Sequence, residues 1–323
     1  DWSSDVCSSD LDERKNPKHP FRGGVYTFPD LVEVRKGEKD FLKEMTLESK
    51  RNRHERNQRA LDTLAAKFEA VSPDIVVVVG DDQHEWFFED VQPSFTIYCA
   101  ETVVNAAIDP VILKTKSEGI ALAMSASHPP EDQVYPVPAD LAHAIIEQTI
   151  IDEFDVAISA EQRANERGTI GVGHGVGFVY RRIIKDKPIP VIPILLNTYF
   201  PPNQPTAKRC YQFGQSIGRA IRAWKDPSGE KRVAICASGG ISHFVIDEDF
   251  DMRMLNAIKN QDTKTIFAEP ANMFRSGTSE TKNWITVAGI LSETGLTMNL
   301  VDYVPSYRSE GGTGCGMAFA TWE

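Results

Sequence analysis

The sequence lacks the features that mark membrane, nucleic-acid-binding and disulfide-rich proteins. It contains no apolar run of about 18 residues, the minimum for a transmembrane helix. It has 35 basic against 46 acidic residues and a formal net charge of −11, which argues against binding to nucleic acid. Its five cysteines are odd in number and form no CxxC pair, so a reducing compartment is expected. These absences predict a soluble, cytoplasmic globular protein.

The first eleven residues, DWSSDVCSSDL, differ in pattern from the rest of the chain. They have no helical or strand period, and they lack the basic and apolar regions of a signal peptide. The string is typical of translated sequencing adaptor. We therefore interpret residues 1–11 as an artefact and expect that the native N-terminus has been lost. Residues 12–323 contain no repeat and no linker-like change in composition, which predicts a single domain.

Apolar runs and amphipathic segments alternate along the rest of the chain. Strands are predicted at 75–80, 95–100, 119–124, 156–159, 190–197 and 232–238, and helices at 46–70, 141–154, 207–224 and 279–291. Prolines in the strand at 190–197 favour an edge or a bulge. Residues 12–45 are expected to form a long surface excursion, and the ending YRSEGGTGCGMAF is expected to be irregular. The alternation predicts an α/β fold with a central mixed or parallel sheet flanked by helices.

Three of the seven histidines stand in settings that favour chemistry. His84 follows the apolar strand at 75–80 in the acidic cluster GDDQHE, His174 lies among glycines in GVGHGVG, and His243 follows the strand at 232–238 in ASGGISHF. Ligands of open α/β sheets bind beyond the carboxyl ends of the strands. We expect structural or surface roles for the other four, which are His19, His54, His128 and His143.

Glu280 has two interpretations that the sequence leaves open. It lies in the predicted first turn of the helix at 279–291, with Thr278 or Ser279 as the cap, where the helix dipole favours a carboxylate by about 0.5 kcal/mol. Alternatively it binds metal, because a glutamate with one or two histidines is the ligand set of the facial triad.

Six segments carry a likeness to a known family. They are PDIVVVVGDDQ, DLAHAIIEQTIIDEFDVA, GHGVGFVY, PVIPILLNTYFPPNQPTAKRCYQFGQSIGRAI, ASGGISHF and SETKNWITVAGIL, and they lie between Pro73 and Trp322. In this order they resemble the LigB-type class III extradiol dioxygenases, which include protocatechuate 4,5-dioxygenase, gallate dioxygenase and 3-O-methylgallate dioxygenase. A single piece such as GGISH is only moderately specific, whereas six in the same order indicate the family.

The resemblance implies an iron(II) enzyme that cleaves the ring of a catecholic acid with dioxygen. In the family, the histidine that matches His243 acts as acid and base, and the one that matches His174 lies in the substrate pocket. The glutamate that matches Glu280, four residues before Trp284, ligates the iron.

The sequence departs from the family at the other two iron ligands. One is a histidine in an Asn-Asp-His context, which reads Asp-Asp-Gln here. Either His84 takes that role one place later, or Gln83 marks a subfamily with a different site. The remaining ligand is a histidine near the N-terminus, and His19 in NPKHPF has different surroundings. The resemblance therefore implies that the iron site of this chain is incomplete.

The same resemblance implies partners and leaves two rival functions open. A small aromatic diol and dioxygen would be the substrates, a homodimer is implied, and a small accessory subunit stays open. One rival is a zinc-dependent hydrolase with His84, His243 and Glu280 as ligands. The other is a non-enzymatic binding protein on the same scaffold, which the substitution at Gln83 would favour.

Overall fold

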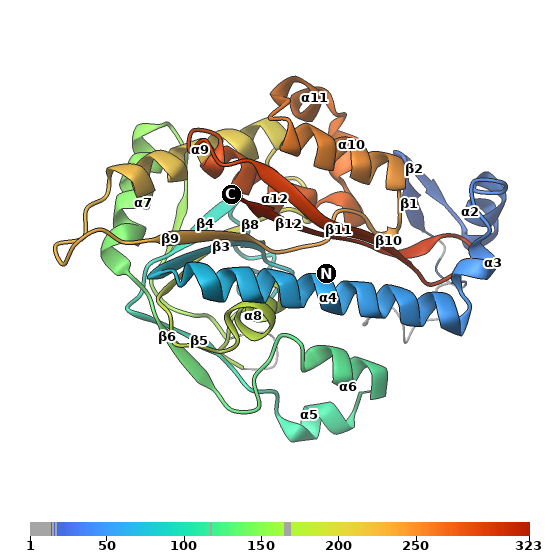
Figure 1. The fold of residues 1–323 in the computed structure, drawn as a ribbon, viewed down its shortest axis with the longest axis horizontal. Helices are drawn as coiled ribbons and strands as arrows, with labels where there is room; N and C mark the ends of the chain where they lie inside the picture. Colours follow the sequence, from blue (N-terminus) through green and yellow to red (C-terminus); the bar gives the residue numbers. More distant parts are fainter. Residues whose placement is uncertain (1–13, 15, 17, 117, 165–168) are drawn as a thin grey trace.

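A computed structural model of the protein describes residues 14, 16, 18–116, 118–164 and 169–323. The expectation that residues 1–11 are an artefact lies outside these residues. The central element is a five-stranded sheet with helices on both sides (Figure 1). The predicted α/β fold is therefore confirmed. Within the described residues, no helix is both long enough and apolar enough to cross a membrane.

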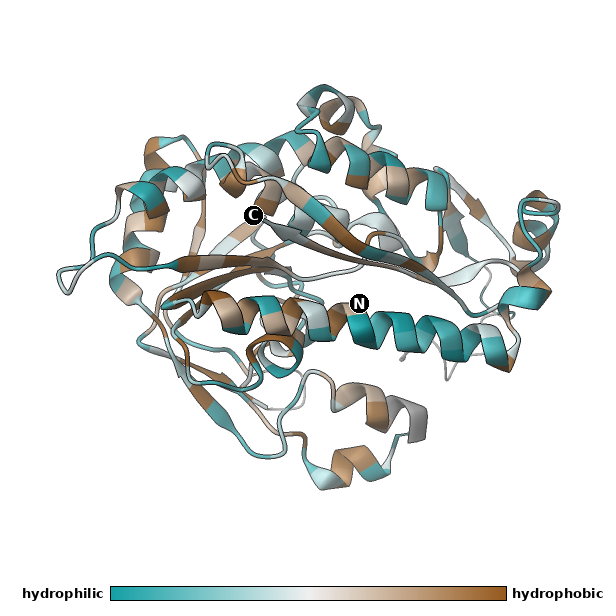
Figure 2. Cartoon of the chain, in the orientation of Figure 1, coloured by the Kyte–Doolittle hydropathy of each residue, from teal (hydrophilic) through white to brown (hydrophobic). Residues whose placement is uncertain are grey.

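The central sheet has the strand order β7-β4-β8-β3-β9. Its strands are β3 (Ile75–Asp81), β4 (Phe95–Tyr98), β7 (Ala157–Ser159), β8 (Val191–Leu196) and β9 (Val233–Ala237). The β4–β8 pair is antiparallel and the other pairs are parallel. Every residue of β3 is buried, as its continuous β-branched run predicts for a strand covered on both faces. The strands form the brown centre of the molecule in Figure 2.

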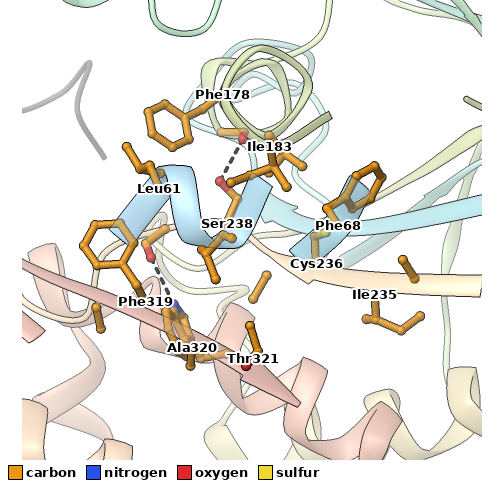
Figure 3. A pocket seen from close by; sticks show the side chains of 18 of the residues that line it. Leu61, Phe68, Phe178, Ile183, Ile235, Cys236, Ser238, Phe319, Ala320 and Thr321 are labelled. Atoms are coloured by element: carbon orange, nitrogen blue, oxygen red, sulfur yellow. Dashed lines mark hydrogen bonds between the residues drawn. The ribbon is translucent and has the colours of Figure 1, made fainter. Parts of the chain in front are cut away.

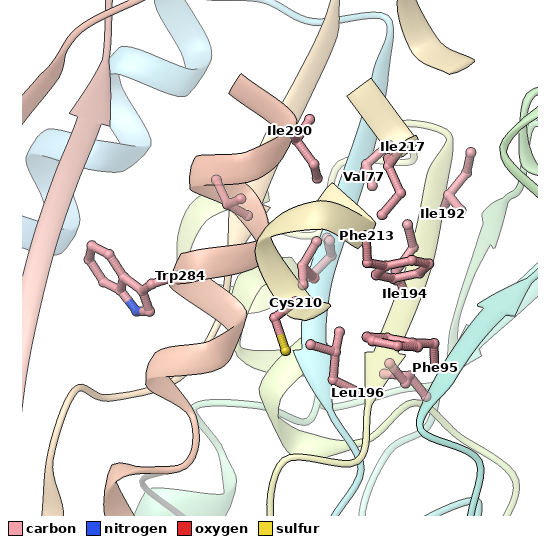
Figure 4. Packing of buried hydrophobic residues seen from close by; sticks show 14 of the residues in the cluster. Val77, Phe95, Ile192, Ile194, Leu196, Cys210, Phe213, Ile217, Trp284 and Ile290 are labelled. Atoms are coloured by element: carbon pink, nitrogen blue, oxygen red, sulfur yellow. The ribbon is translucent and has the colours of Figure 1, made fainter. Parts of the chain in front are cut away.

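Four long helices of the model match the helical predictions. They are α4 (Leu47–Val71), α7 (Ala139–Ile151), α9 (Ala207–Ala223) and α12 (Thr281–Leu291). Cys210, Phe213 and Ile217 on α9 lie over the β8 residues Ile192 and Ile194 (Figure 4). This apolar stripe is the one that the 3.6-residue period of α9 predicts.

The remaining elements surround this core. They are β1 (His19–Phe21), β2 (Gly24–Tyr26), α2 (Phe28–Val34), α3 (Phe41–Glu44), β5 (Thr102–Asn105), α5 (Pro110–Lys114), α6 (Glu118–Met124), β6 (Gln133–Pro136), α8 (His174–Val179), the π-helix η2 (Tyr180–Ile184), β10 (His243–Val245), α10 (Glu248–Lys259), α11 (Thr263–Ala268), the 3-10 turns η3 (Ala271–Phe274) and η4 (Ser276–Thr278), β11 (Met298–Tyr307) and β12 (Thr313–Trp322).

The strand at 190–197 does not lie at an edge, as its prolines predicted. It is β8, the middle strand of the sheet. The antiparallel ladder with β4 runs from Leu196 to Ile194, so Pro193 lies just beyond the pairs that β4 makes. Its missing N–H group therefore removes no hydrogen bond from that ladder.

The structure differs from three other local predictions. The apolar run at 119–124 belongs to helix α6 rather than to a strand, because periodicity cannot distinguish a short buried strand from a short helix. The segment 12–45 contains the β1–β2 hairpin and helices α2 and α3. The glycine-rich ending is not irregular, because most of it belongs to β12, which pairs with β11 on one side and β10 on the other.

Candidate functional site

A cavity of about 610 Å³ opens at the carboxyl ends of β3 and β9. Its polar end is formed by Asp81, His174, Ser238 and Glu280. Apolar side chains from α4, α8, β9 and β12 make up most of the rest, among them Leu61, Phe68, Phe178, Ile183, Ile235 and Phe319 (Figure 3). The cavity therefore places a few polar groups beside a large apolar wall, the usual composition of a small-molecule site.

Glu280 and His243 form a buried pair at this end of the sheet. Glu280 is the N-cap residue of α12, one place after Ser279 and two after Thr278, the two caps that the sequence predicted. Its Oε1 lies 3.2 Å from Nε2 of His243, and the two side chains are 1% and 2% exposed. Burial opposes a charge on the carboxyl, but His243 outweighs it and lowers the pKa of Glu280 below its usual value. Glu280 is therefore held as a carboxylate against an imidazole.

The turn after β9 is shaped around this carboxylate. The backbone N–H of Gly240 donates to Oε2 of Glu280 at 3.0 Å. Gly239 has φ +124°, and a Cβ at this position would come within 2.8 Å of the same oxygen. A side chain at Gly239 would therefore be strained and would displace Glu280.

Asp81, the last residue of β3, is a second buried carboxylate at the cavity. Asn283 donates to its Oδ1 at 3.0 Å, and Gln83 donates to its Oδ2 at 2.7 Å. Burial, together with the negative charge of Glu280, raises the pKa of Asp81 to about 6. Glu280 thus raises the proton affinity of Asp81, and the two buried carboxylates form a local negative field that a cation would relieve.

His174 is held by Glu85, a carboxylate of the acidic cluster GDDQHE. Oε1 of Glu85 accepts from the backbone N–H of His174 at 2.6 Å and lies 2.7 Å from its Nδ1. Burial disfavours the charged imidazole, but Glu85 outweighs it and raises the pKa of His174. Gly173 is required beside this pair, because a Cβ there would lie 2.2 Å from Oε2 of Glu85.

The structure does not bring His84 to the cavity. Its ring stacks on Phe200 with centroids 3.6 Å apart, and its Nε2 lies 2.5 Å from the amide nitrogen of Gln92. Gln83 instead reaches back to Asp81. The residue that lines the cavity at the end of β3 is therefore Asp81 and not His84. A metal-binding role for His84 stays a prediction that these contacts do not support.

A second buried network holds the turn that carries His243. Ser242 donates its hydroxyl to Asp251 at 2.8 Å and accepts from the backbone N–H of Asp247 at 3.0 Å. The Tyr303 hydroxyl also donates to Asp251, at 2.5 Å. No motif pointed to Asp251, because its neighbours in the sequence are those of an ordinary helix. Glu85, in contrast, lies in the acidic cluster that was noted after β3.

The side chains at this cavity are of the types that bind a divalent cation, but too few of them lie together to hold one. Carboxylates and imidazoles are ligands that iron(II) accepts, and Glu280 and Asp81 provide buried carboxylates at one cavity. However, the described residues bring together no group of three or more His, Cys, Asp or Glu side chains that could hold a metal ion. These residues therefore do not form a complete metal site by themselves.

Sequence comparisons relate the chain to known proteins. The family described as the catalytic LigB subunit of aromatic ring-opening dioxygenase matches residues 42–318. A 2,3-dihydroxyphenylpropionate/2,3-dihydroxicinnamic acid 1,2-dioxygenase of Cupriavidus necator is 30% identical over 174 residues, which are 54% of this chain and 45% of that protein. The gallate dioxygenase of Pseudomonas putida is 30% identical over 129 residues, or 37% of each chain. The chain thus spans about half the length, or less, of the curated relatives it matches.

Proposed function

Because the chain belongs to the family of catalytic LigB subunits of aromatic ring-opening dioxygenases, we propose that it opens the ring of a small aromatic diol with dioxygen. The observation that carries this proposal is the buried Glu280–His243 pair at a cavity that His174 also lines. The family likeness implies the role of an iron ligand for Glu280, of an acid–base group for His243 and of a substrate-pocket residue for His174.

Iron(II) is the proposed cofactor, with Glu280 as one of its ligands. When bound, such an ion transfers electron density between a diol and dioxygen. The described residues do not complete the coordination of such an ion.

His243 is the proposed acid–base group. Its Nε2 faces the Glu280 carboxylate at 3.2 Å, which holds the ring in one orientation for the transfer of a phenolic proton. The turn network of Ser242 and Asp251 keeps the ring in place. His174, whose charged form Glu85 favours, is suited to donate a hydrogen bond to an oxygen of the bound diol.

The substrate class proposed is a catecholic acid. The names of the relatives specify gallate and 2,3-dihydroxyphenylpropionate, and the family resemblance adds protocatechuate and 3-O-methylgallate. The apolar wall of the cavity would cover the ring and any apolar substituent. These four diols are the compounds to test first.

The test is oxygen uptake with added iron(II) and each diol, followed by a search for a ring-opened chromophore. We expect oxygen uptake with at least one diol. Uptake should fall about 100-fold or more in His243→Ala, since removal of an acid–base group costs at least that much. A similar loss is expected in Glu280→Gln, which removes the proposed carboxylate ligand of the iron. His54→Ala, on the exposed face of α4, is the control and should retain full activity. Product formation without oxygen consumption would instead indicate the zinc hydrolase.

One observation favours a second candidate, a non-enzymatic binding protein. The described residues lack a cluster of three metal-binding side chains, and Gln83 stands where the family has a histidine. If the protein binds a diol but retains no iron after dialysis against iron(II), metal analysis will support this alternative over the dioxygenase.

A further inference from the structure

A second and larger cavity, of about 1130 Å³, lies on a different part of the molecule. Its walls come from the loop after β8 and the start of α9 (residues 199–208), from Phe244 on β10, and from the segment between α11 and α12 (residues 267–276). It shares no lining residue with the cavity of Glu280 and His174. Any ligand of this second cavity would therefore occupy a site of its own.

The lining of the second cavity is strongly cationic, although the protein carries a net charge of −11. Its charged lining residues are five cations and one carboxylate, namely Lys18, Lys208, Arg275, Lys282, Arg308 and Glu269. Arg253 binds the two oxygens of Glu269 at 2.7 and 2.9 Å, so this carboxylate is already neutralised. The local excess of positive charge favours an anionic ligand.

The cavity differs from a cluster of surface lysines because one of its cations, Lys282, is buried. It is only 2% exposed, and it lies in the first turn of α12. Its ammonium donates to the carbonyl oxygen of Thr198 at 2.8 Å, and no second acceptor for it occurs among the residues that the structure describes. The Asp81 carboxylate favours the charge of Lys282, but an ammonium can donate three hydrogen bonds, and burying donors without acceptors is unfavourable. An anion in the cavity would supply the missing partner.

The cavity also offers aromatic surface beside these cations. Tyr199, Phe244, Phe267 and Phe274 line it, and Phe274 is almost completely buried, at 4% exposure. Aromatic side chains bind planar rings by offset or edge-to-face contact. Inorganic anions would use the cations alone, whereas an aromatic anion would use both kinds of surface.

We propose that this second cavity binds a small aromatic carboxylate. The carboxylate accepts a hydrogen bond from Lys282, with Lys208 and Arg275 adding positive charge at the mouth, and the ring packs against the aromatic side chains. Lys208 and Arg275 are exposed and form no ion pair with another described residue. The proposal does not rest on ring cleavage, because the two cavities share no lining residue. They are neighbours, since Thr198, which accepts from Lys282, also donates to Asp81.

The test is isothermal titration of the metal-free protein with 4-hydroxybenzoate, which has no diol, and with 4-hydroxybenzamide as its uncharged counterpart. We expect binding of the carboxylate and at least tenfold weaker binding of the amide. Lys282→Met keeps the length of the side chain without the charge and should weaken carboxylate binding at least tenfold. Lys225→Met, at an exposed lysine outside both cavities, should leave binding unchanged.

Two further variants keep the outcome decisive. If Lys282→Met fails to fold, as circular dichroism would show, Arg275→Gln replaces it, because Arg275 is exposed and should weaken binding by a smaller factor without loss of structure. His174→Ala alters only the first cavity and should bind 4-hydroxybenzoate as the wild type does. Equal binding of the amide, unchanged binding in both cation variants, or loss of binding in His174→Ala would overturn the proposal.

Discussion

At the residue scale, two carboxylate–imidazole pairs determine the electrostatics of the candidate site. Glu280 faces His243 at 3.2 Å and Glu85 faces His174 at 2.7 Å. The first pair is buried and the second is half-buried, so the attraction within each is screened less than at the surface. In the second pair Glu85 favours the protonated form of His174 and raises its pKa.

The Glu85–His174 pair gives a prediction that does not depend on activity. Glu85→Gln removes the negative charge while keeping the shape, so the pKa of His174 should fall, because burial is then opposed only by the weaker effects of Asp81 and Glu280. An NMR titration of the histidine Hε1 signals measures this. Glu89→Gln, at an exposed glutamate four residues along the chain, should leave the pKa of His174 unchanged. Equal values in wild type and Glu85→Gln would contradict the pairing.

Asp251 predicts how stability depends on pH. Burial raises its pKa well above the usual value, and the hydrogen bonds from Tyr303 and Ser242 only partly oppose this. Between the unfolded pKa of about 3.9 and the raised folded value, the folded state binds more protons than the unfolded state. The free energy of unfolding contributed by Asp251 should therefore fall as pH rises in this window, by at most about 1.4 kcal/mol per pH unit.

Asp251→Asn should remove this slope, because the amide has no proton to lose and its oxygen can still accept from Tyr303 and Ser242. Urea denaturation at several pH values from about 5 to about 8 measures the slope. Asp155→Asn, at an exposed aspartate, should keep the wild-type slope. A slope that survives in Asp251→Asn would show that other groups cause it.

At the scale of elements, the α9–α12 pair depends on glycine. A Cβ on Gly214 would lie 2.0 Å from the carbonyl oxygen of Thr286, and a Cβ on Gly289 would lie 2.1 Å from that of Tyr211. The two helices therefore approach each other backbone to backbone, and their packing is the most extensive helix–helix contact in the described part of the chain. Because α12 begins at the Glu280 cap, this packing also positions the site.

Gly214→Ala should destabilise the protein by about 1–3 kcal/mol, the usual cost of inserting a methyl group into a closely packed interface. The melting temperature and the urea midpoint measure this. Gly80→Ala is the matched control, because its Cβ would meet only Val176, at an ordinary 3.7 Å. If Gly214→Ala proves as stable as Gly80→Ala, α9 and α12 do not pack as closely as described.

At the scale of the whole molecule, stability should differ sharply between the central sheet and the α5–α6 segment. All residues of β3 and β8 are buried, whereas α5 has no buried residue and projects with α6 from the lower side in Figure 1. Local opening requires little energy where few apolar contacts are lost.

Hydrogen exchange measured by mass spectrometry should therefore show the slowest exchange in peptides covering β3 and β8 and the fastest in peptides covering α5. Peptides from α9, which is also well buried, serve as a control within the same sample. Protection of α5 comparable to that of β3 would mean that another surface covers it.

Individual helices and strands show how much of the fold could be predicted from the sequence. The helices α4, α7, α9 and α12 and the strands β3 and β9 follow from local periodicity, which a short window contains in full. The central place of β8, the β11–β12 hairpin and the helical state of α6 depend on neighbours far along the chain. For the same reason the Glu85–His174 contact, between residues 89 positions apart, was not predicted.

The sequence by itself determined the α/β class, the main helices and strands, and the likeness to a ring-opening dioxygenase family, because these depend on local pattern and on motifs in a fixed order. Only the tertiary structure decided which polar side chains share a cavity. It joined Glu280 to His243, placed Asp81 rather than His84 at the end of β3, and revealed the cationic second cavity. The reason is physical, since side-chain direction and burial are set by packing between distant segments and not by neighbours in the chain.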